Sequence, residues 1–218
     1  MKKLLLGIAA VCLAGFTFAQ DAPLWMRHSV ISPDGTTIAF TYKGDIYTVP
    51  VAGGRAMQIT TNPAYDTAPV WSPDSKRIAF ASDRMGSLDV YIVAKDGGEP
   101  RRLTTHSGSE TPLAFTDAGH VLFSAGIMPS AEAVVFPSNG QFNQVYRVSV
   151  EGGRPTMISS MPMECISINK EGAMLYQDKK GYEDYWRKHH VSPIARDIWM
   201  YTPGKEPQYR QLTTFGGE

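Results

Sequence analysis

A four-residue turn motif, followed each time by a short apolar segment, occurs four times along the chain. The motif reads SPDG at 32–35, SPDS at 72–75, TDAG at 116–119 and NKEG at 169–172. The apolar segments that follow are TIAFTY, RIAFAS, HVLFSA and AMLYQD. Successive motifs begin 40, 44 and 53 residues apart. A repeat of this length is typical of architectures in which one small unit is stacked several times.

The residues of the motif predict a tight turn between two strands. Proline presets φ, aspartate accepts hydrogen bonds from nearby amides, and glycine occupies a position that is unfavourable for a side chain. Residues 72–75 are therefore predicted to connect a strand ending at Trp71 to a strand over Arg77–Ser82. Within the second strand, Ile78 and Phe80 share one face while Ala79 and Ala81 share the other. Because both faces are apolar, we expect this sheet to lie between two neighbouring sheets.

A second recurring stretch completes each unit. It reads DIYTVPVAGG from residue 45, DVYIVAKDGG from 89, QVYRVSVEGG from 144 and DIWMYTPGKE from 197. The glycine pairs at 53–54, 97–98 and 152–153 are predicted to turn a third strand into a fourth. Four short antiparallel strands per unit are typical of a β-propeller blade. We therefore predict an all-β fold, a β-propeller over residues 22–218 with about four blades, at about 28–66, 67–110, 111–164 and 165–218.

The repeat resembles the propeller repeats of TolB and of the tricorn proteases. The stretches PLWMRHSVISPDGTTIAFTYKGDIYTVPVAGG and DKKGYEDYWRKHHVSPIARDIWMY resemble more specifically the first propeller of tricorn-type serine peptidases. This resemblance implies a six-bladed ring, of which the four blades form an incomplete, open part. It also implies that the catalytic Ser, His and Glu and a PDZ-like domain follow downstream. The chain is then an N-terminal piece of a longer protein, and PLWMR at 23–27 is expected to supply an outer strand to the last blade.

The N-terminus has the features of a signal peptide. MKK is a positive n-region, LLLGIAAVCLAGF an apolar core, and TFA a cleavage site ending at Ala19. We expect residues 1–19 to be removed and the protein to be exported to the periplasm or cell envelope, with no membrane span after cleavage. A lipoprotein signal at Cys12 is the less favoured alternative. Cys165 is then the only cysteine, which excludes an internal disulfide, and we expect it to be buried and structural.

Neither the composition nor the motifs of the chain predict a catalytic site or a nucleic-acid partner. Lysine plus arginine and aspartate plus glutamate both number 21, so a nucleic-acid partner is not expected. The chain has no GxSxG elbow, P-loop, HExxH or CxxC motif. No catalytic, cofactor-binding or metal-binding residue is therefore predicted, and no cofactor.

Three groups of residues nevertheless have a functional interpretation beside a structural one. A metal site can be drawn from Glu183, Asp184, His189, His190 and Asp197, although a solvated loop is the favoured reading. Asp83 and Arg84 are predicted to form a turn-stabilising, salt-bridging pair between blades rather than a binding group. Tyr182, Tyr185 and Trp186 form either an aromatic contact patch or, as favoured, packing over a blade edge.

Two long insertions occupy the same position in the third and fourth units, at 126–143 and 179–196. Long loops on a rigid scaffold often carry function, and these two are expected on one side of the disc. The favoured function is the non-catalytic propeller of an exported tricorn-like serine peptidase, which binds or guides peptides. The alternative is a TolB-like periplasmic propeller that acts as a protein-binding module. Expected partners are peptides or proteins, the remaining propeller and peptidase domains, and a second copy of the chain.

Overall fold

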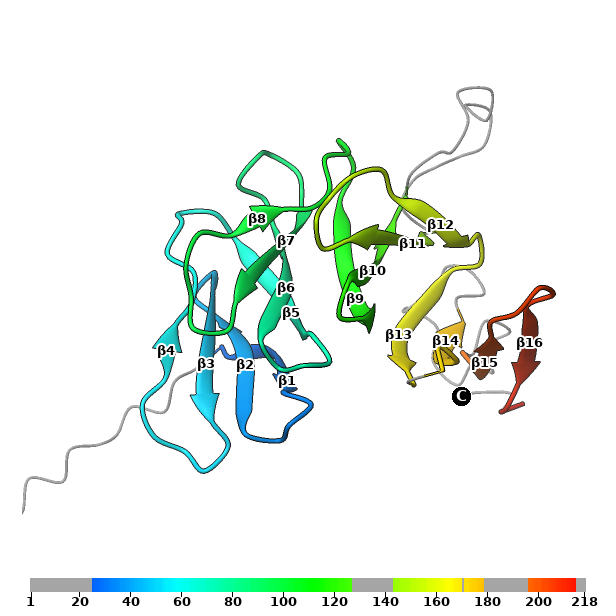
Figure 1. Cartoon of the computed structure of the whole chain (residues 1–218), viewed down its shortest axis with the longest axis horizontal. Helices are drawn as coiled ribbons and strands as arrows, with labels where there is room; N and C mark the ends of the chain where they lie inside the picture. Colours follow the sequence, from blue (N-terminus) through cyan, green and yellow to red (C-terminus); the bar gives the residue numbers. More distant parts are fainter. Residues whose placement is uncertain (1–24, 127–142, 170, 179–195, 215–218) are drawn as a thin grey trace, which may run out of the picture.

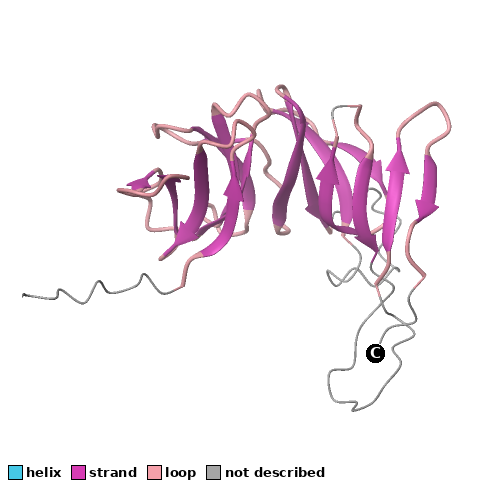
Figure 2. Cartoon of the chain, turned by 90° about the horizontal axis from the view of Figure 1, so that it is seen from below, coloured by secondary structure: helices cyan, strands magenta, loops and turns pink. Residues whose placement is uncertain are grey.

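The computed structural model describes residues 25–126, 143–169, 171–178 and 196–214. Every regular element in these ranges is a β-strand, and the ranges contain no helix (Figure 2). No helix in the described part of the chain is therefore long and apolar enough to cross a membrane. The described strands form four separate sheets of four strands each, all with antiparallel pairing.

Each sheet is built from strands that are consecutive in the chain. The first contains β1 (Arg27–Ile31), β2 (Thr37–Tyr42), β3 (Asp45–Pro50) and β4 (Met57–Gln58). The second contains β5 (Asp66–Trp71), β6 (Arg77–Ser82), β7 (Asp89–Ala94) and β8 (Arg101–Arg102). The third contains β9 (Glu110–Asp117), β10 (His120–Ala125), β11 (Gln144–Ser149) and β12 (Thr156–Ser159). The fourth contains β13 (Met163–Ile168), β14 (Met174–Asp178), β15 (Ile198–Thr202) and β16 (Gln208–Gln211).

The four sheets stand side by side along an arc (Figure 1). The first strand of each sheet, β1, β5, β9 or β13, lies on the concave side of the arc, and the fourth strand lies on the outside. This arrangement confirms the predicted β-propeller of four-stranded antiparallel blades, and the described sheets do not close into a ring. Arg27, the last residue of PLWMR, is the first residue of β1, and residues 23 and 24 lie outside the described ranges.

The second sheet has two buried faces, as its sequence predicts. β6 spans Arg77–Ser82, the predicted limits. Ile78 and Phe80 pack in one core with Ala39, Ile46 and Ile59 of the first sheet. Ala79 packs in a second core with Val121 and Phe123 of the third sheet. A third core joins the third and fourth sheets and includes Leu122, Val145, Met174 and Tyr176. Burial of apolar area between neighbouring sheets is thus the main stabilising term of the arc.

The predicted turn chemistry is also confirmed. Ser72 Oγ donates a hydrogen bond to Asp74 Oδ1 at 2.5 Å, and the same carboxylate accepts the Lys76 amide at 3.1 Å. The fourth turn position is left-handed, with φ of 72° at Gly35 and 57° at Ser75. Both glycines of each predicted pair have positive φ, for example 92° at Gly97 and 116° at Gly98. A side chain is strained in this region, which explains why glycine recurs there.

Cys165 differs from the prediction. Its side chain is exposed rather than buried. Cys165 lies within an irregularity of the β13–β14 pairing, between Glu164 and Ser167, and its φ is 52°. An extra residue at such a bulge breaks the alternation of strand faces, so the position of this cysteine in the pattern does not determine which way it points.

Candidate functional site

The strongest candidate site is a groove on the concave side of the arc, with a volume of about 750 Å³. All four sheets contribute to it, through the last residues of their inner strands and the turns that follow. Its lining residues are Val30, Ile31, Pro33, Val70, Trp71, Pro73, Leu113, Ala114, Phe115, Thr116, Asp117, Ala118, Ser167, Ile168 and Asn169. We call it the axial groove.

The repeat explains why the axial groove is mostly apolar. Ile31 pairs with Ile38 in the first sheet, and Trp71 pairs with Ile78 in the second, so the two residues occupy the same register position. Val30 and Val70 are related in the same way. Each copy of the repeat therefore places an apolar side chain at the same height of the concave wall.

The strands that line the groove are edge strands of their sheets. β1, β5, β9 and β13 each stand at the end of the strand order and pair with one neighbour among the described strands. An edge strand presents backbone N–H and C=O groups that an extended peptide can pair with. Apolar side chains and edge backbone together are suited to holding a peptide rather than to bond-breaking chemistry.

Hydrogen bonds between sheets hold the lining strands in position. Trp71 Nε1 donates to the carbonyl of Val30 at 3.2 Å, which joins β5 to β1 across the groove wall. Ser75 Oγ accepts the amide of Asp34 at 3.1 Å between the corresponding turns. Arg77 of the second sheet donates to the carbonyl of Ala118 in the third. The wall is therefore fixed by side chains that reach from one blade to the next.

Buried acids lie at the opposite ends of the inner strands. Asp66 opens β5 and Glu110 opens β9, and both side chains are buried. Sequence reasoning did not identify either residue as important. A usable signal was present, because an acid followed by threonine stands at the same place in the repeat, Asp66-Thr67 and Glu110-Thr111.

Arg84 is held by Asp66, which corrects the prediction of a pair between blades. Arg84 Nη2 lies 3.0 Å from each Asp66 carboxylate oxygen, and its guanidinium lies 4.5 Å from the ring centroid of Tyr91. Asp66 pairs with Ser82 in the same sheet, so Arg84 lies two residues beyond the cross-strand partner. Asp83 accepts the amide of Tyr65 at 2.7 Å. These residues brace one blade and do not point into the axial groove.

A second repeated cluster closes the outer hairpin of the first and fourth blades. Thr60 Oγ1 donates to Asp45 at 3.2 Å and accepts the amide of Ile46 at 3.0 Å. Thr213 makes the same two contacts with Asp197 and Ile198, each at 2.9 Å. Burial raises the pKa of Asp45, while the hydrogen bond from Thr60 acts in the opposite direction. Asp197 is thus engaged in a structural hairpin.

The remaining residues of the candidate metal and aromatic groups lie outside the described ranges. These are Tyr182, Glu183, Asp184, Tyr185, Trp186, His189 and His190, together with nearly all of the two insertions. Within the described ranges, no group of three or more histidine, cysteine or acidic side chains is placed to hold a metal ion.

Comparison with known proteins places this architecture in a family. Residues 23–218 match the family described as the tricorn protease N-terminal beta propeller domain. Tricorn protease homolog 1 of Streptomyces coelicolor is 25% identical over 180 residues, which are 82% of this chain and 16% of that protein. The chain thus spans less than a quarter of the length of the curated relatives it matches.

Two solved structures share the fold. The crystal structure of the tricorn protease superposes with a TM-score of 0.64 and 17% identity, over 90% of this chain and 19% of that one. The structure of a putative TolB from Agrobacterium tumefaciens superposes with a TM-score of 0.61 and 22% identity, over 87% of this chain and 68% of that one. With its four described blades, its concave wall and the match over nearly its whole length, the chain belongs to the family of tricorn protease N-terminal β-propeller domains.

Proposed function

We propose that this chain is the non-catalytic propeller portion of an exported tricorn-like serine peptidase, and that it binds peptides and guides them to a downstream catalytic domain. The observation that carries the proposal is the axial groove, because four edge strands and an apolar wall meet there. Residues 1–19 are its signal peptide in this proposal, with cleavage after Ala19 and a destination in the periplasm or cell envelope.

The groove suits an extended peptide better than a compact ligand. Its lining comes from successive blades, so it offers a series of similar apolar contacts. Alternate side chains of an extended peptide would meet that wall, while its backbone would pair with an edge strand. Such contacts depend little on peptide sequence, which is appropriate for a domain that passes on many substrates.

A second function, a TolB-like module that binds other proteins, is favoured by one observation. The chain covers 68% of the putative TolB from Agrobacterium tumefaciens but 19% of the tricorn protease. The coding sequence that follows codon 218 separates the two functions. Further blades followed by a PDZ-like segment and a serine peptidase domain would support the peptidase. A stop codon after two more blades would support the binding module.

The peptide-binding proposal is tested by placing a charge in the groove. Ile31 lines the groove and is 58% exposed, so Ile31→Glu adds a carboxylate there with little effect on packing. We expect a panel of fluorescently labelled unstructured peptides to bind about tenfold more weakly in anisotropy titrations, because an apolar contact is replaced by a charge that must lose water. Ser167→Glu, an exposed position on the opposite wall, should act in the same direction.

Met57→Glu is the matched control. Met57 is also apolar and is 52% exposed, but it lies on β4, at the outer side of the first sheet. This variant should bind the peptides as the wild type does. Equal affinity of the Ile31→Glu, Ser167→Glu and wild-type chains would show that peptides do not use the axial groove.

A further inference from the structure

The contact between the second and third sheets, here called the middle seam, contains a buried acid, Glu110, that forms no ion pair among the described residues. Glu110 is fully buried, and its amide donates to the carbonyl of Leu88 at 2.7 Å across the seam. Among the described residues, neither oxygen of its carboxyl group accepts a well-formed hydrogen bond, although the hydroxyl of Thr104 is close enough to favour the ionised form. Ala125, its cross-strand neighbour on β10, is uncharged. A buried carboxylate without an ion-pair partner is costly, so the group favours its neutral form.

Glu110 and its charged neighbours, Asp89 and Arg102, make a group of two acids and one base. Asp89, the first residue of β7, is fully buried, and Arg102 Nη2 on β8 lies 2.8 Å from its Oδ2. The pKa of Glu110 is raised to about 7, chiefly by burial; the charge of Asp89 acts in the same direction, while the Thr104 hydroxyl and Arg102 act in the opposite one. One arginine therefore faces two acids, and its closest contact is with Asp89. Asp66 and Arg84 of the second sheet form an ion pair with each other, at 3.0 Å.

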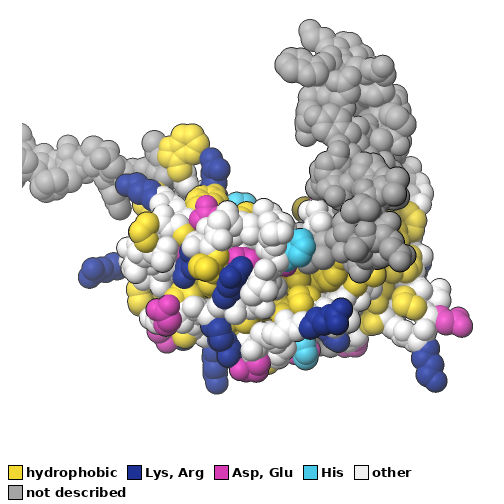
Figure 3. Space-filling view, turned by 90° about the horizontal axis from the view of Figure 1, so that it is seen from above, with side chains coloured by type: hydrophobic (Ala, Val, Ile, Leu, Met, Phe, Trp, Pro, Cys, Tyr) yellow, Lys and Arg dark blue, Asp and Glu magenta, His cyan; other side chains and the backbone are white. Residues whose placement is uncertain are grey.

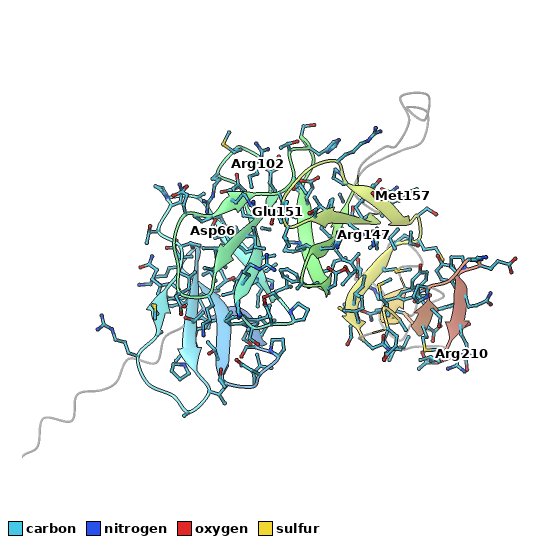
Figure 4. The ribbon with its side chains drawn as sticks, viewed as in Figure 1. Asp66, Arg102, Arg147, Glu151, Met157 and Arg210 are labelled. Atoms are coloured by element: carbon cyan, nitrogen blue, oxygen red, sulfur yellow. The ribbon has the colours of Figure 1, made fainter. Side chains whose placement is uncertain are left out.

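The two neighbouring seams have different residues at the positions of Glu110, Asp89 and Arg102. Between the first and second sheets, Asp66 occupies the register position of Glu110, and Arg84 contacts both of its oxygens. Between the third and fourth sheets, the positions of Glu110, Asp89 and Arg102 are occupied by Met163, Gln144 and Met157. Figure 4 labels Arg102 and Met157, which stand at equivalent places on β8 and β12. The first seam therefore pairs its acid at this position with an arginine, and the third seam has methionine there. In the middle seam, Glu110 forms no ion pair among the described residues.

We propose that Glu110, Asp89 and Arg102 form a proton-dependent latch: the packed middle seam holds Glu110 protonated, and loss of that proton loosens the contact between the second and third sheets. Ionisation would leave two buried carboxylates against one guanidinium, and opening of the seam would let water reach them. Both sheets line the axial groove, so its width would respond to pH. The latch rests on burial and register and does not depend on the proposed function.

The direction of the pH effect follows from linkage. The pKa of Glu110 is raised in the packed state above its ordinary value of 4.5, to about 7. Its stabilising contribution is therefore complete below pH 4.5 and is lost as the pH rises through about 7. Hydrogen exchange measured at pH 5.5 and pH 7.5, and corrected for intrinsic exchange rates, reports the opening. In the wild type we expect the protection of residues 88–92 and 110–114 to fall on the order of tenfold between these pH values.

Glu110→Gln removes the titration and should show less than a twofold change over the same range. A triple variant gives the middle seam the residues of the third–fourth seam: Asp89→Gln, Arg102→Met and Glu110→Met. It should fold, and its hydrogen-exchange protection should also change less than twofold between the two pH values. Glu171→Gln, at an exposed acid of the β13–β14 turn in the fourth sheet, should respond as the wild type does. The latch is refuted if Glu110 titrates near 4.5 in carboxyl-carbon NMR of the wild type, or if either insensitive variant keeps the full pH response.

Discussion

At the residue scale, the aspartate of the turn motif accepts several hydrogen bonds that lower the pKa of its carboxyl group. Asp34 Oδ1 accepts hydrogen bonds from the hydroxyl of Ser32 at 2.6 Å and from the amide and hydroxyl of Thr36. These contacts lower the pKa of Asp34 to about 2, and the Ser32 hydroxyl makes the largest contribution. Asp74 repeats the arrangement with Ser72 and Lys76, and its pKa is lowered for the same first reason. The motif thus stabilises the ionised form of its aspartate.

This environment predicts how the turn responds to acid. Because the pKa is depressed, the contribution of Asp34 is present above its ordinary value of 3.8 and is lost as the pH falls through about 2. The wild type should therefore have a higher urea midpoint than Asp34→Asn at pH 6, and the difference should shrink toward pH 2. Asp96→Asn, at an exposed acid of another turn, should leave the midpoint nearly unchanged at both pH values. A constant difference for Asp34→Asn would contradict the assignment.

At the element scale, the sheets depend on one another through cross-blade contacts. Phe80 and Tyr91 stack with ring centroids 5.9 Å apart on the face of the second sheet that packs against the first. Phe123 and Tyr146 repeat this stack at 5.6 Å on the third sheet, facing the second. The second and third blades therefore each present an aromatic pair to the blade before them, and the units stabilise their neighbours as in other repeat proteins.

The Trp71 hydrogen bond provides a test of this dependence. Trp71→Phe keeps most of the apolar contact but removes the donor to the Val30 carbonyl, and we expect a loss of about 1 kcal/mol in unfolding free energy. Hydrogen exchange should accelerate mainly in β1 and β2. Trp199→Phe is the matched control, because its indole donates to Asp178 within the fourth sheet. Trp199→Phe should accelerate exchange within the fourth sheet only. Unchanged exchange of β1 and β2 in Trp71→Phe would show that Trp71 does not couple the first two sheets.

At the scale of the whole molecule, the two end sheets are packed on one face by the described residues. The fourth sheet exposes Leu175, Ile198 and Leu212 at 43%, 47% and 43%. The equivalent positions of the second sheet, Ala79, Val90 and Leu103, are buried against the third sheet. Seen from above, hydrophobic side chains gather toward the third and fourth sheets, whereas charged side chains are frequent over the first two (Figure 3). Such a surface favours association.

We therefore expect the isolated chain to self-associate, with amides of the first and fourth sheets exchanging faster than those of the second and third. Light scattering over a concentration series and hydrogen exchange measure the two effects. Ile198→Lys should reduce association by placing a charge on the exposed face. Met85→Lys, at a 65% exposed residue of the β6–β7 turn, should not. A monodisperse wild-type monomer with uniform protection in all four sheets would mean that the described arc is complete as it stands.

Much of this architecture could be predicted from the sequence, because turns and strand faces depend on residues that are close together in the chain. The limits of β6, the turn at residues 72–75 and the glycine pairs follow from φ preferences and from side-chain alternation, which act over a few residues. The two apolar faces of β6 in turn required a sheet on each side. Membership of the tricorn propeller family follows from the same repeat, read over the whole chain.

Other features were decided by tertiary contacts. Arg84 reaches Asp66, 18 residues earlier, because strand pairing brings Ser82 opposite that acid, and its sequence neighbours do not reveal this. Cys165 is exposed because a bulge reverses its direction. Glu110 is an ordinary turn-flanking acid in the sequence and becomes a buried, unpaired one only when the third sheet packs on the second. The axial groove likewise exists only between blades, since burial and electrostatic environment are properties of packed surfaces, whereas turns and strand faces are properties of short segments.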